Sequence, residues 1–375
     1  MTERGITADL QRLTVPAEAA AAVIRDGMTV AMSGYAMAGY PKAVPAELVR
    51  RKAGGEALSL QLITGANVPW LDELLGAAGV VSRRVPMCAA RTLAGQINSG
   101  VVRYVEQQMH KMPRLLREGR FGRIDVAVVE ALGFTEDGEL IPTSSVGMVH
   151  HLMQAAERIV IEVNAAQPEI LSDLHDVWIP PVFPHAEPVP LVHPGQRIGT
   201  GSVPVDMRKV CCIVETDIPE KLDMQSRRAP ETAGIVTNLF DFLETEARSR
   251  ENRFPPVQIG FGGIADAVAD AFRDSGFRDL SFFCGGTTEP VLELLAAGKA
   301  AAVSTGGIGM SSRVTEILAG TPDIRDRLVI RNGDITNSPE VISRLGLLAL
   351  NSGIEVDIYG NVNSSHITGS RGVNG

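Results

Sequence analysis

Short apolar runs alternate along the chain with stretches whose apolar residues recur at helical spacing. Four of the runs contain few polar positions and predict strands: residues 28–34, 58–65, 124–132 and 158–164. Strands of a parallel sheet show this continuous pattern because helices cover both of their faces. The stretches "PAELVRRK" and "PWLDELLGAAG" predict helices between these strands. The alternation therefore predicts an α/β fold around a largely parallel sheet.

The second half of the chain repeats the pattern of the first half. "GYPKAV" (39–44) is followed by "LSLQLITGANVPWLDELLGAAG" (58–79), and "GGIADAV" (262–268) is followed by "LSFFCGGTTEPVLELLAAG" (280–298). Both copies contain, in one order, a glycine-rich turn, a G-x-x-x-A-V helix, a Leu-Ser strand, a small-residue turn, a proline and a Glu-Leu-Leu helix. Shared order and nearly equal spacing indicate a duplication.

The duplication predicts two similar open α/β domains, residues 1–215 and 216–375, in which Val44 corresponds to Val268. Segment 177–199, near the end of the first domain, is rich in proline. Proline removes backbone donors and disfavours helix, so this segment predicts an extended connector that runs over the surface between the domains.

Composition narrows the class of protein. Apolar residues make up 45% and charged residues 21% of the chain, as in ordinary globular proteins. The net charge of −9 is spread along the chain, which argues against nonspecific binding to nucleic acid or to an anionic membrane. No apolar run reaches ~18 residues, so no membrane span is expected. The four cysteines lack C-x-x-C spacing, so we expect reduced thiols, no metal site and a cytoplasmic location.

Three glycine-rich turns between a strand and a helix are candidate ligand sites: 33–41, 260–266 and 284–289. Backbone N–H groups are unpaired at such turns, and the helix dipole favours negative charge. "GFGGIA" in the second turn also matches the dinucleotide pattern G-x-G-x-x-A, with Asp279 nineteen residues after Gly260. A single match of this kind is weak, and a tight turn without a ligand is the plainer alternative.

Several polar residues allow two interpretations. Lys42 at a helix start is either solvated or meets an anion, because the helix dipole disfavours a cation there. His150 and His151 follow "PTSSVG" without metal-ligand spacing, and a serine of that stretch is expected to cap the following helix. His366 lies in a dense polar loop that either caps itself or holds a carboxylate.

Longer stretches resemble a known family, the class I CoA-transferases, and within it the acetyl-CoA hydrolase/transferase branch that includes succinyl-CoA:acetate and 4-hydroxybutyrate CoA-transferases. The matching stretches span nearly the whole chain: "SGYAMAGYPKAVP", "GFTEDGELIPTSSVG", "EVNAAQPEILSDLHDVWIP", "RIGTGSVPVD", "GFGGIADAV" and "RLGLLALNSGIEVDIYGNVNSSHITGSRGVNG". The resemblance implies two related open α/β domains, coenzyme A as part of an acyl-CoA substrate, a small carboxylic acid as the second substrate, and no metal.

The resemblance also implies covalent catalysis, in which a glutamate at a strand tip of the second domain forms an anhydride and then a glutamyl-CoA thioester. The Thr-Glu pair typical of that strand falls on Cys284 and Gly285, so glycine replaces the nucleophile. Cys284 is then a nucleophile, a proton carrier or a buried structural thiol. Glu289, four residues beyond Gly285, is the other candidate for the missing carboxylate.

Two further groups of site residues follow from the resemblance. They are an oxyanion and CoA-binding loop of Gly262, Gly263 and Ile264, and substrate contacts at Gly39, Tyr40, Lys42 and Asn351. In the family the stretch matching "GSRGVNG" continues into a Gly-Gly-Ser loop and a long C-terminal segment, whereas this sequence stops at Gly375. We therefore expect a truncated second domain, whose missing part is supplied by another polypeptide or has been removed.

Four functions stay open at this point. The first is an acyl-CoA enzyme of altered chemistry, such as a hydrolase, decarboxylase, lyase or cyclising enzyme, that is active with a complementary chain. The second is a true CoA-transferase in which Glu289 acts as nucleophile. The third is a noncatalytic scaffold subunit of a heteromeric complex, and the fourth is a dinucleotide-binding oxidoreductase.

Overall fold

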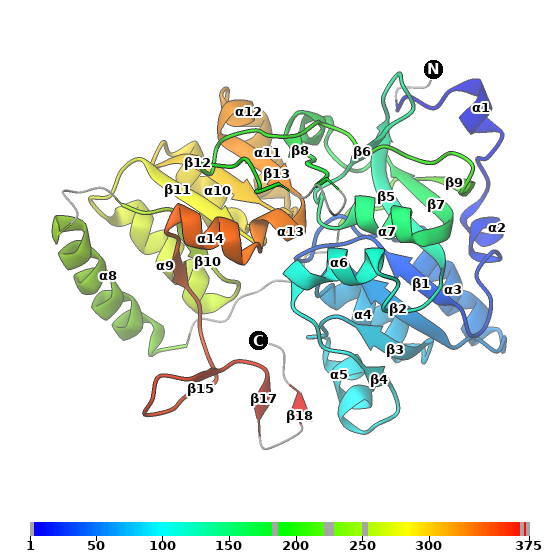
Figure 1. Ribbon diagram of the computed structural model, residues 1–375, viewed down its shortest axis with the longest axis horizontal. Coiled ribbons are helices and arrows are strands. Elements are labelled where there is room, and N and C mark those ends of the chain that lie inside the picture. The colour runs from blue at the N-terminus through cyan, green and yellow to red at the C-terminus, as the bar shows by residue number, and fades with distance from the viewer. Residues whose placement is uncertain (1–3, 182–186, 221–228, 250–253, 368–370, 373–375) are drawn as a thin grey trace.

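The computed structural model describes residues 4–181, 187–220, 229–249, 254–367 and 371–372. It contains two main sheets, one in each half of the chain, with helices packed against both (Figure 1). The predicted α/β class is confirmed. The continuous apolar runs form strands because both faces of each sheet are covered.

The first sheet has the strand order β4-β3-β2-β1-β5-β7-β9, in which every neighbouring pair is parallel, and β6 pairs antiparallel with β5. Its strands are β1 (Thr29–Met32), β2 (Leu60–Thr64), β3 (Val81–Val85), β4 (Arg103–Tyr104), β5 (Ile124–Phe134), β6 (Leu140–Pro142), β7 (Ala156–Asn164) and β9 (Val210–Thr216). All four predicted strands are present in this sheet, as β1, β2, β5 and β7.

The helices of the first half connect these strands. They are α1 (Ala8–Gln11), α2 (Ala17–Ala21), α3 (Ala43–Ala53), α4 (Pro69–Ala77), α5 (Arg91–Asn98), α6 (Met112–Arg117), α7 (Val149–Ala155) and the 3-10 turns η1 (Met109–Lys111) and η2 (Glu169–Asp173). The two predicted helices correspond to α3 and α4. Each crosses between parallel neighbours, which cannot be joined by a tight hairpin.

The second sheet has the order β14-β10-β11-β12-β13-β8, again with parallel neighbours. Its strands are β8 (His175–Asp176), β10 (Val257–Ile259), β11 (Leu280–Cys284), β12 (Ala300–Thr305), β13 (Leu328–Arg331) and β14 (Leu348–Leu350). The helices are α8 (Thr232–Ser249), α9 (Gly263–Asp274), α10 (Glu289–Ala296), α11 (Ser312–Gly320), α12 (Ile324–Arg327), α13 (Gly333–Thr336) and α14 (Pro339–Leu345).

The two halves share a motif. β1-α3-β2-α4-β3 in the first half and β10-α9-β11-α10-β12 in the second follow one order of elements, and both place their strands in the same sheet order. Val44 lies in α3 and Val268 in α9, and both are buried. This agreement supports the proposed duplication.

The chain crosses between the halves before it reaches residue 215. β8 joins the edge of the second sheet through β13, and the chain then returns to the first sheet as β9. The described part of segment 177–199 packs on the second half: Leu191 is buried against Phe283, and Arg331 donates to Pro194 O at 2.9 Å. The proline-rich segment is therefore attached to the second sheet along part of its length.

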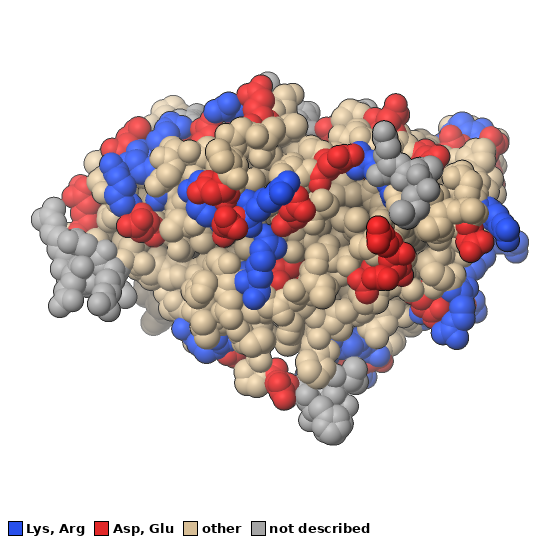
Figure 2. Space-filling model, turned by 90° about the horizontal axis from the view of Figure 1, so that it is seen from above, with Lys and Arg blue, Asp and Glu red and all other residues tan. Residues whose placement is uncertain are grey.

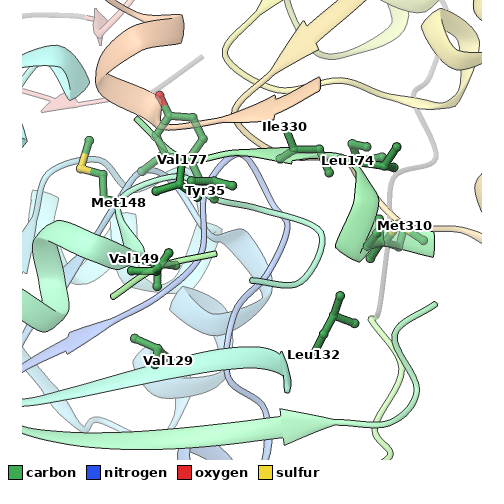
Figure 3. Close-up of a cluster of buried hydrophobic side chains, with 14 of the residues drawn as sticks. Tyr35, Val129, Leu132, Met148, Val149, Leu174, Val177, Met310 and Ile330 are labelled. Atoms are coloured by element: carbon green, nitrogen blue, oxygen red, sulfur yellow. The ribbon is translucent and has the colours of Figure 1, made fainter. Parts of the chain in front are cut away.

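One hydrophobic core continues through both halves. Figure 3 shows Tyr35 and Met148 from the first half near Val177 and Ile330, and all four are buried. A shared core of this kind fixes how the two halves sit against each other, which in turn fixes any site built from both of them.

A C-terminal arm leaves the second sheet after β14. It contains two small antiparallel pairs, β15 (Glu355–Val356) with β16 (Val362–Asn363), and β17 (His366–Ile367) with β18 (Arg371–Gly372). The arm hangs below the two halves in Figure 1, and Asn98 of α5 binds both the N–H and the carbonyl of Gly372.

Candidate active site between the two halves

The tip of β11 meets a turn from the first half of the chain. Cys284 ends β11 and is buried, whereas the next residue, Gly285, is partly exposed. At Gly286 an added Cβ would lie 2.3 Å from the Ala36 Cβ atom. Only glycine permits so close an approach, so the turn containing Ala36 and the β11 tip form one surface.

The turn between Tyr35 and Ala38 carries backbone strain. Its two ends exchange backbone hydrogen bonds of 2.9 and 3.1 Å, and the central residues Ala36 and Met37 have φ angles of 50° and 76°. Glycine or asparagine normally occupies such positions, and other residues there cost about 1–3 kcal/mol each. Strain of this size is typical of functional sites, and this strained turn places Ala36 against the β11 tip.

Tyr35, from the first half, packs against residues of the second half beside this tip. Its side chain is fully buried, and Cβ atoms added at Gly147, Gly306 or Gly333 would lie 2.4–2.6 Å from that side chain. Its hydroxyl donates to the carbonyl of Gly333 at 3.3 Å. Burial raises the pKa of Tyr35 well above its usual value, so the hydroxyl stays protonated.

Gly285 lies next to Asn337 and an open cleft. An added Cβ at Gly285 would be 3.4 Å from both Oδ1 and Nδ2 of Asn337. Asn337 lines a cleft of about 330 Å³ whose other walls are Met87 and residues 106–110 of the first half. In this cleft burial lowers the pKa of His110 and Lys111 adds to the shift. Gly285 therefore lies beside a residue that lines this cleft.

The glycine loop after β10 reaches the same place. Gly262 has a φ of 106° and precedes α9, whose first residue is Gly263, and Ile264 is partly buried. An added Cβ at Gly286 would lie 2.5 Å from the Phe261 ring. The loop that precedes α9 thus lies beside the β11 tip, and the first N–H groups of a helix have no partners within the helix.

Asn351 follows β14 at the same edge of the sheet. Its side chain exchanges two hydrogen bonds with Gln258 of β10, at 2.6 and 3.1 Å, and its Oδ1 would lie 3.0 Å from a Cβ atom added at Gly260. The structure therefore brings Asn351 and the 260–264 loop together.

Cys284 and Glu289 differ in their surroundings. The Cys284 side chain is 1% exposed, and burial raises the pKa of its thiol to about 11, so it is protonated at neutral pH. Glu289 starts α10 and accepts a 2.7 Å hydrogen bond from the Ser311 hydroxyl, which also caps α11. Its carboxylate is thus engaged at the start of α11.

Lys42 lies in a buried charge cluster rather than in solvent. Its side chain is 2% exposed, and its ammonium group donates to Glu130 and, at 2.9 Å, to Tyr40 O. The same ammonium lies 4.5 Å from the Tyr40 ring centroid. Of the two interpretations of Lys42, the solvated one is wrong, and the anions it meets are carboxylates of the protein itself.

Glu162 and Glu220 complete this cluster, and neither was singled out in the sequence. Glu162 accepts from the N–H groups of Lys42, Ala43 and Val44 at 2.6–3.0 Å and so caps α3. Glu220 Oε1 accepts from Gly39 N at 2.7 Å, and Lys42 Nζ lies 3.9 Å from it.

Burial also perturbs the acidity of this cluster. Burial raises the pKa of Glu220 to about 7, Glu130 adds to the shift, and Lys42 opposes it. Gly39 is bound through Glu220 and Tyr40 stacks on Trp70 with ring centroids 5.4 Å apart. The cluster therefore fixes residues 39–42, the loop that leads into α3, through hydrogen bonds to buried groups.

The expected serine cap before His150 is wrong. α7 follows Met148 without a side-chain cap, because both candidate serines bind elsewhere. Ser144 donates to Glu220 at 2.8 Å, and Ser145 donates to Gly306 O at 3.1 Å across the two halves. His366 lies in the C-terminal arm, where its ring contacts the Ser365 hydroxyl at 2.9 Å.

A metal site and a membrane span find no support in the described part of the chain. There, no three histidine, cysteine, aspartate or glutamate side chains cluster as metal ligands would. No helix among the same residues has the length and apolar character needed to cross a bilayer. On the face seen in Figure 2, acidic and basic side chains are interspersed rather than gathered into a basic field.

Comparison with known proteins places this geometry in a family. Residues 4–215 match the acetyl-CoA hydrolase/transferase N-terminal domain, and residues 314–375 match the corresponding C-terminal domain. A solved structure, RipA from Yersinia pestis, has the same fold, with a TM-score of 0.71 and 19% identity over 95% of this chain and 76% of that chain.

Curated relatives agree with the family match. The succinyl-CoA:acetate CoA-transferase of Clostridium kluyveri is 34% identical over 373 residues, 98% of this chain and 69% of that protein. The acetyl-CoA hydrolase of Eremothecium gossypii is 30% identical over 368 residues, 94% of this chain and 70% of that protein. The chain belongs to the acetyl-CoA hydrolase/transferase family.

Proposed function

We propose that this protein processes acyl-CoA thioesters without a covalent glutamyl-CoA intermediate, and that hydrolysis is its reaction. The observation that carries the proposal is Gly285: the residue directly after β11 has no side chain, and it lies beside Asn337, which lines the cleft. Hydrolysis needs only water as the second reactant, and one of the relatives is named an acetyl-CoA hydrolase. Decarboxylation and cyclisation need a particular acyl group as well.

In the proposed site, both halves of the chain contribute residues that bind the thioester. N–H groups at Gly262, Gly263 and Ile264 stabilise the oxyanion of the thioester carbonyl, because the start of α9 has unpaired donors. Asn351 contributes an amide at the same edge. The cleft beside Asn337 takes the acyl group, with Gly39 and Tyr40 supporting the turn from the first half.

The experiment is a comparison of hydrolysis and exchange by the purified protein. With acetyl-CoA or succinyl-CoA, we expect release of free CoA that does not depend on added acetate. Intact-protein mass spectrometry during turnover is expected to show no CoA adduct. Turnover that requires acetate, together with an adduct on the chain, would contradict the proposal.

A true CoA-transferase is the alternative, and Glu289 is the residue on which it depends. Its carboxylate lies at the start of α10, four residues past Gly285, but it is hydrogen-bonded to Ser311. A CoA adduct mapped to Glu289 would establish this alternative. A noncatalytic scaffold role predicts instead that only a complex with a second chain turns over, and that changes in this chain's cleft leave the rate unaltered.

Cys284→Ala is expected to leave thioester turnover within about twofold of the unaltered protein. The thiol is buried and, with a pKa of about 11, is too weakly acidic to act as a thiolate at neutral pH. Loss of the buried sulfur is expected to cost about 1–2 kcal/mol of unfolding free energy. Steady-state kinetics measures the first effect and urea denaturation the second; a loss of turnover beyond tenfold with retained folding would make Cys284 catalytic.

We also propose a second polypeptide partner in the cytoplasm that binds at the β14 edge and the arm. Among the described residues, β14 pairs only with β10, which leaves an open sheet edge. Ile358 and Tyr359 of the arm are 93% and 85% exposed, and Val356 and Val362 beside them are also exposed. Open edges and exposed apolar side chains favour association.

The chain alone is therefore expected to self-associate in a concentration-dependent way in sedimentation velocity. Replacing Ile358 and Tyr359 with serine should reduce this association, because it removes exposed apolar surface. The matched control is Val101→Ser, which changes an exposed apolar residue outside the arm. A monomer at all concentrations, with or without the arm substitutions, would contradict the partner proposal.

A further inference from the structure

The orientation of the Asn337 side chain is fixed by its neighbours. Its Nδ2 donates to Gly333 O at 3.0 Å and to Thr336 Oγ1 at 3.1 Å, and it also contacts the Tyr35 hydroxyl. The Gly333 carbonyl can only accept, so the nitrogen must face it. The amide oxygen therefore points away from α13.

That oxygen is available to a ligand. No described residue donates a hydrogen bond to Asn337 Oδ1, which lies 3.4 Å from the position of a Cβ atom at Gly285. Asn337 also lines the open cleft. An unfilled amide acceptor at the wall of a cleft, beside an absent side chain, is a suitable place for one ordered water.

We propose that Asn337 is a catalytic residue, whose Oδ1 holds the attacking water in the space left by Gly285. The inference rests on the proposed thioester hydrolysis. The water oxygen forms a bond to the acyl carbon while the carbon–sulfur bond breaks. The sulfur keeps the bonding electron pair and takes a proton from the water, which gives a carboxylic acid and the CoA thiol without any other reactant.

The surroundings make Asn337 a rigid support for this water. Tyr35 is seated among glycines of both halves, and its raised pKa keeps its hydroxyl in one protonation state. An amide cannot remove a proton from water, so its contribution is orientation of the nucleophile. Orientation affects the chemical step more than substrate binding, and misplacement by about 1 Å can cost on the order of 100-fold in rate.

The test uses Asn337→Ala in the full chain, with acetyl-CoA and succinyl-CoA as substrates. We expect kcat for hydrolysis to fall on the order of 10- to 100-fold and KM to change less than about threefold. Asn98→Ala is the matched control, since the Asn98 amide is also hydrogen-bonded, here to the N–H and carbonyl of Gly372, but lies in α5 at the arm. It is expected to hydrolyse at the unaltered rate.

Hydroxylamine separates a role in water placement from a structural role. As a stronger nucleophile it depends less on being oriented, so Asn337→Ala should still form hydroxamate from acyl-CoA at a rate within about threefold of the unaltered protein. Equal loss of hydrolysis and hydroxamate formation would overturn the inference, because it would indicate a damaged site. Unaltered hydrolysis in Asn337→Ala would overturn it as well.

Gly285→Ala provides an independent second variant. Gly285 does not have a left-handed φ, so alanine fits its backbone, and the added methyl group would contact Asn337 at 3.4 Å. It should displace the water and lower kcat on the order of 10-fold or more. If the unaltered protein cleaves no acyl-CoA, the proposed function itself fails; if it cleaves and both variants match it, only the inference about Asn337 fails.

Discussion

Gly285→Glu is expected to convert the protein from hydrolysis to exchange of CoA between acyl-CoA and acetate. The substitution supplies a carboxylate at the β11 tip, where an anhydride and then a glutamyl-CoA thioester can form. Exchange should rise from undetectable to measurable, and hydrolysis should fall on the order of 10-fold or more, because the new side chain occupies the proposed water position.

The backbone permits this substitution. Gly285 lies outside the left-handed region, so a glutamate there adds no φ strain. Its Cβ atom would have its nearest contacts with Asn337, at the ordinary distance of 3.4 Å, so the position has room for a Cβ atom. The neighbouring Gly286 offers no such room, since a Cβ atom there would lie 2.3 Å from Ala36.

Gly285→Gln is the matched control for shape. Glutamine fills the same space but cannot form an anhydride, so it should lose hydrolysis without gaining exchange. Peptide mass spectrometry should locate a CoA adduct at residue 285 only in the glutamate variant. Equal exchange by the glutamine and glutamate variants, or an adduct at Glu289 in either, would contradict the assignment of the nucleophile position.

The sequence predicted those parts of the fold that depend on local pattern. The strands β1, β2, β5 and β7 are continuous apolar runs, which directly reflect burial on both faces. β8 was missed because it is two polar residues, His175 and Asp176, and its pairing with β13 joins segments about 150 residues apart. No local pattern carries such a pairing.

The candidate site likewise contains residues with a local sequence signal and residues that only the fold brings together. Gly285 and the glycine loops were found because they end or follow recognisable strands. Asn337 and Glu220 lie in short polar segments, and only the folded chain brings Asn337 to Gly285 and Glu220 to Gly39. Glu130 and Glu162 did carry a usable signal, since each is a charge that interrupts the apolar run of its strand and must have a buried partner.

Lys42→Met is expected to lower the unfolding free energy by about 3–5 kcal/mol at pH 8. Lys42 neutralises Glu130 inside the protein and lies 3.9 Å from Glu220, so its loss leaves buried carboxylates without their cation. Lys52→Met on the same helix is the matched control, because Lys52 donates to Leu58 O and is only partly buried. Its cost should stay below about 1.5 kcal/mol.

The loss caused by Lys42→Met should also depend on pH. Burial raises the pKa of Glu220 from 4.5 to about 7, and Lys42 opposes that shift, so removing the lysine raises the pKa further. A folded-state pKa above the unfolded value means that Glu220 stabilises the fold below about pH 4.5. This stability is lost as pH rises through the folded pKa. Urea denaturation at pH 5 should therefore show a smaller difference between Lys42→Met and the unaltered protein than at pH 8.

Glu220→Gln separates the effect of the Glu220 charge from that of its hydrogen bonds. Glu220 Oε1 accepts both known hydrogen bonds, from Gly39 and Ser144, and a glutamine oxygen can accept both in the same way. Added to Lys42→Met, it removes one uncompensated carboxylate and should recover about 1–2 kcal/mol at pH 8 but little at pH 5, where Glu220 is already protonated. A double variant no more stable than Lys42→Met at pH 8 would show that the charge of Glu220 does not contribute to the loss, which then comes from Glu130 or from packing of the lysine stem.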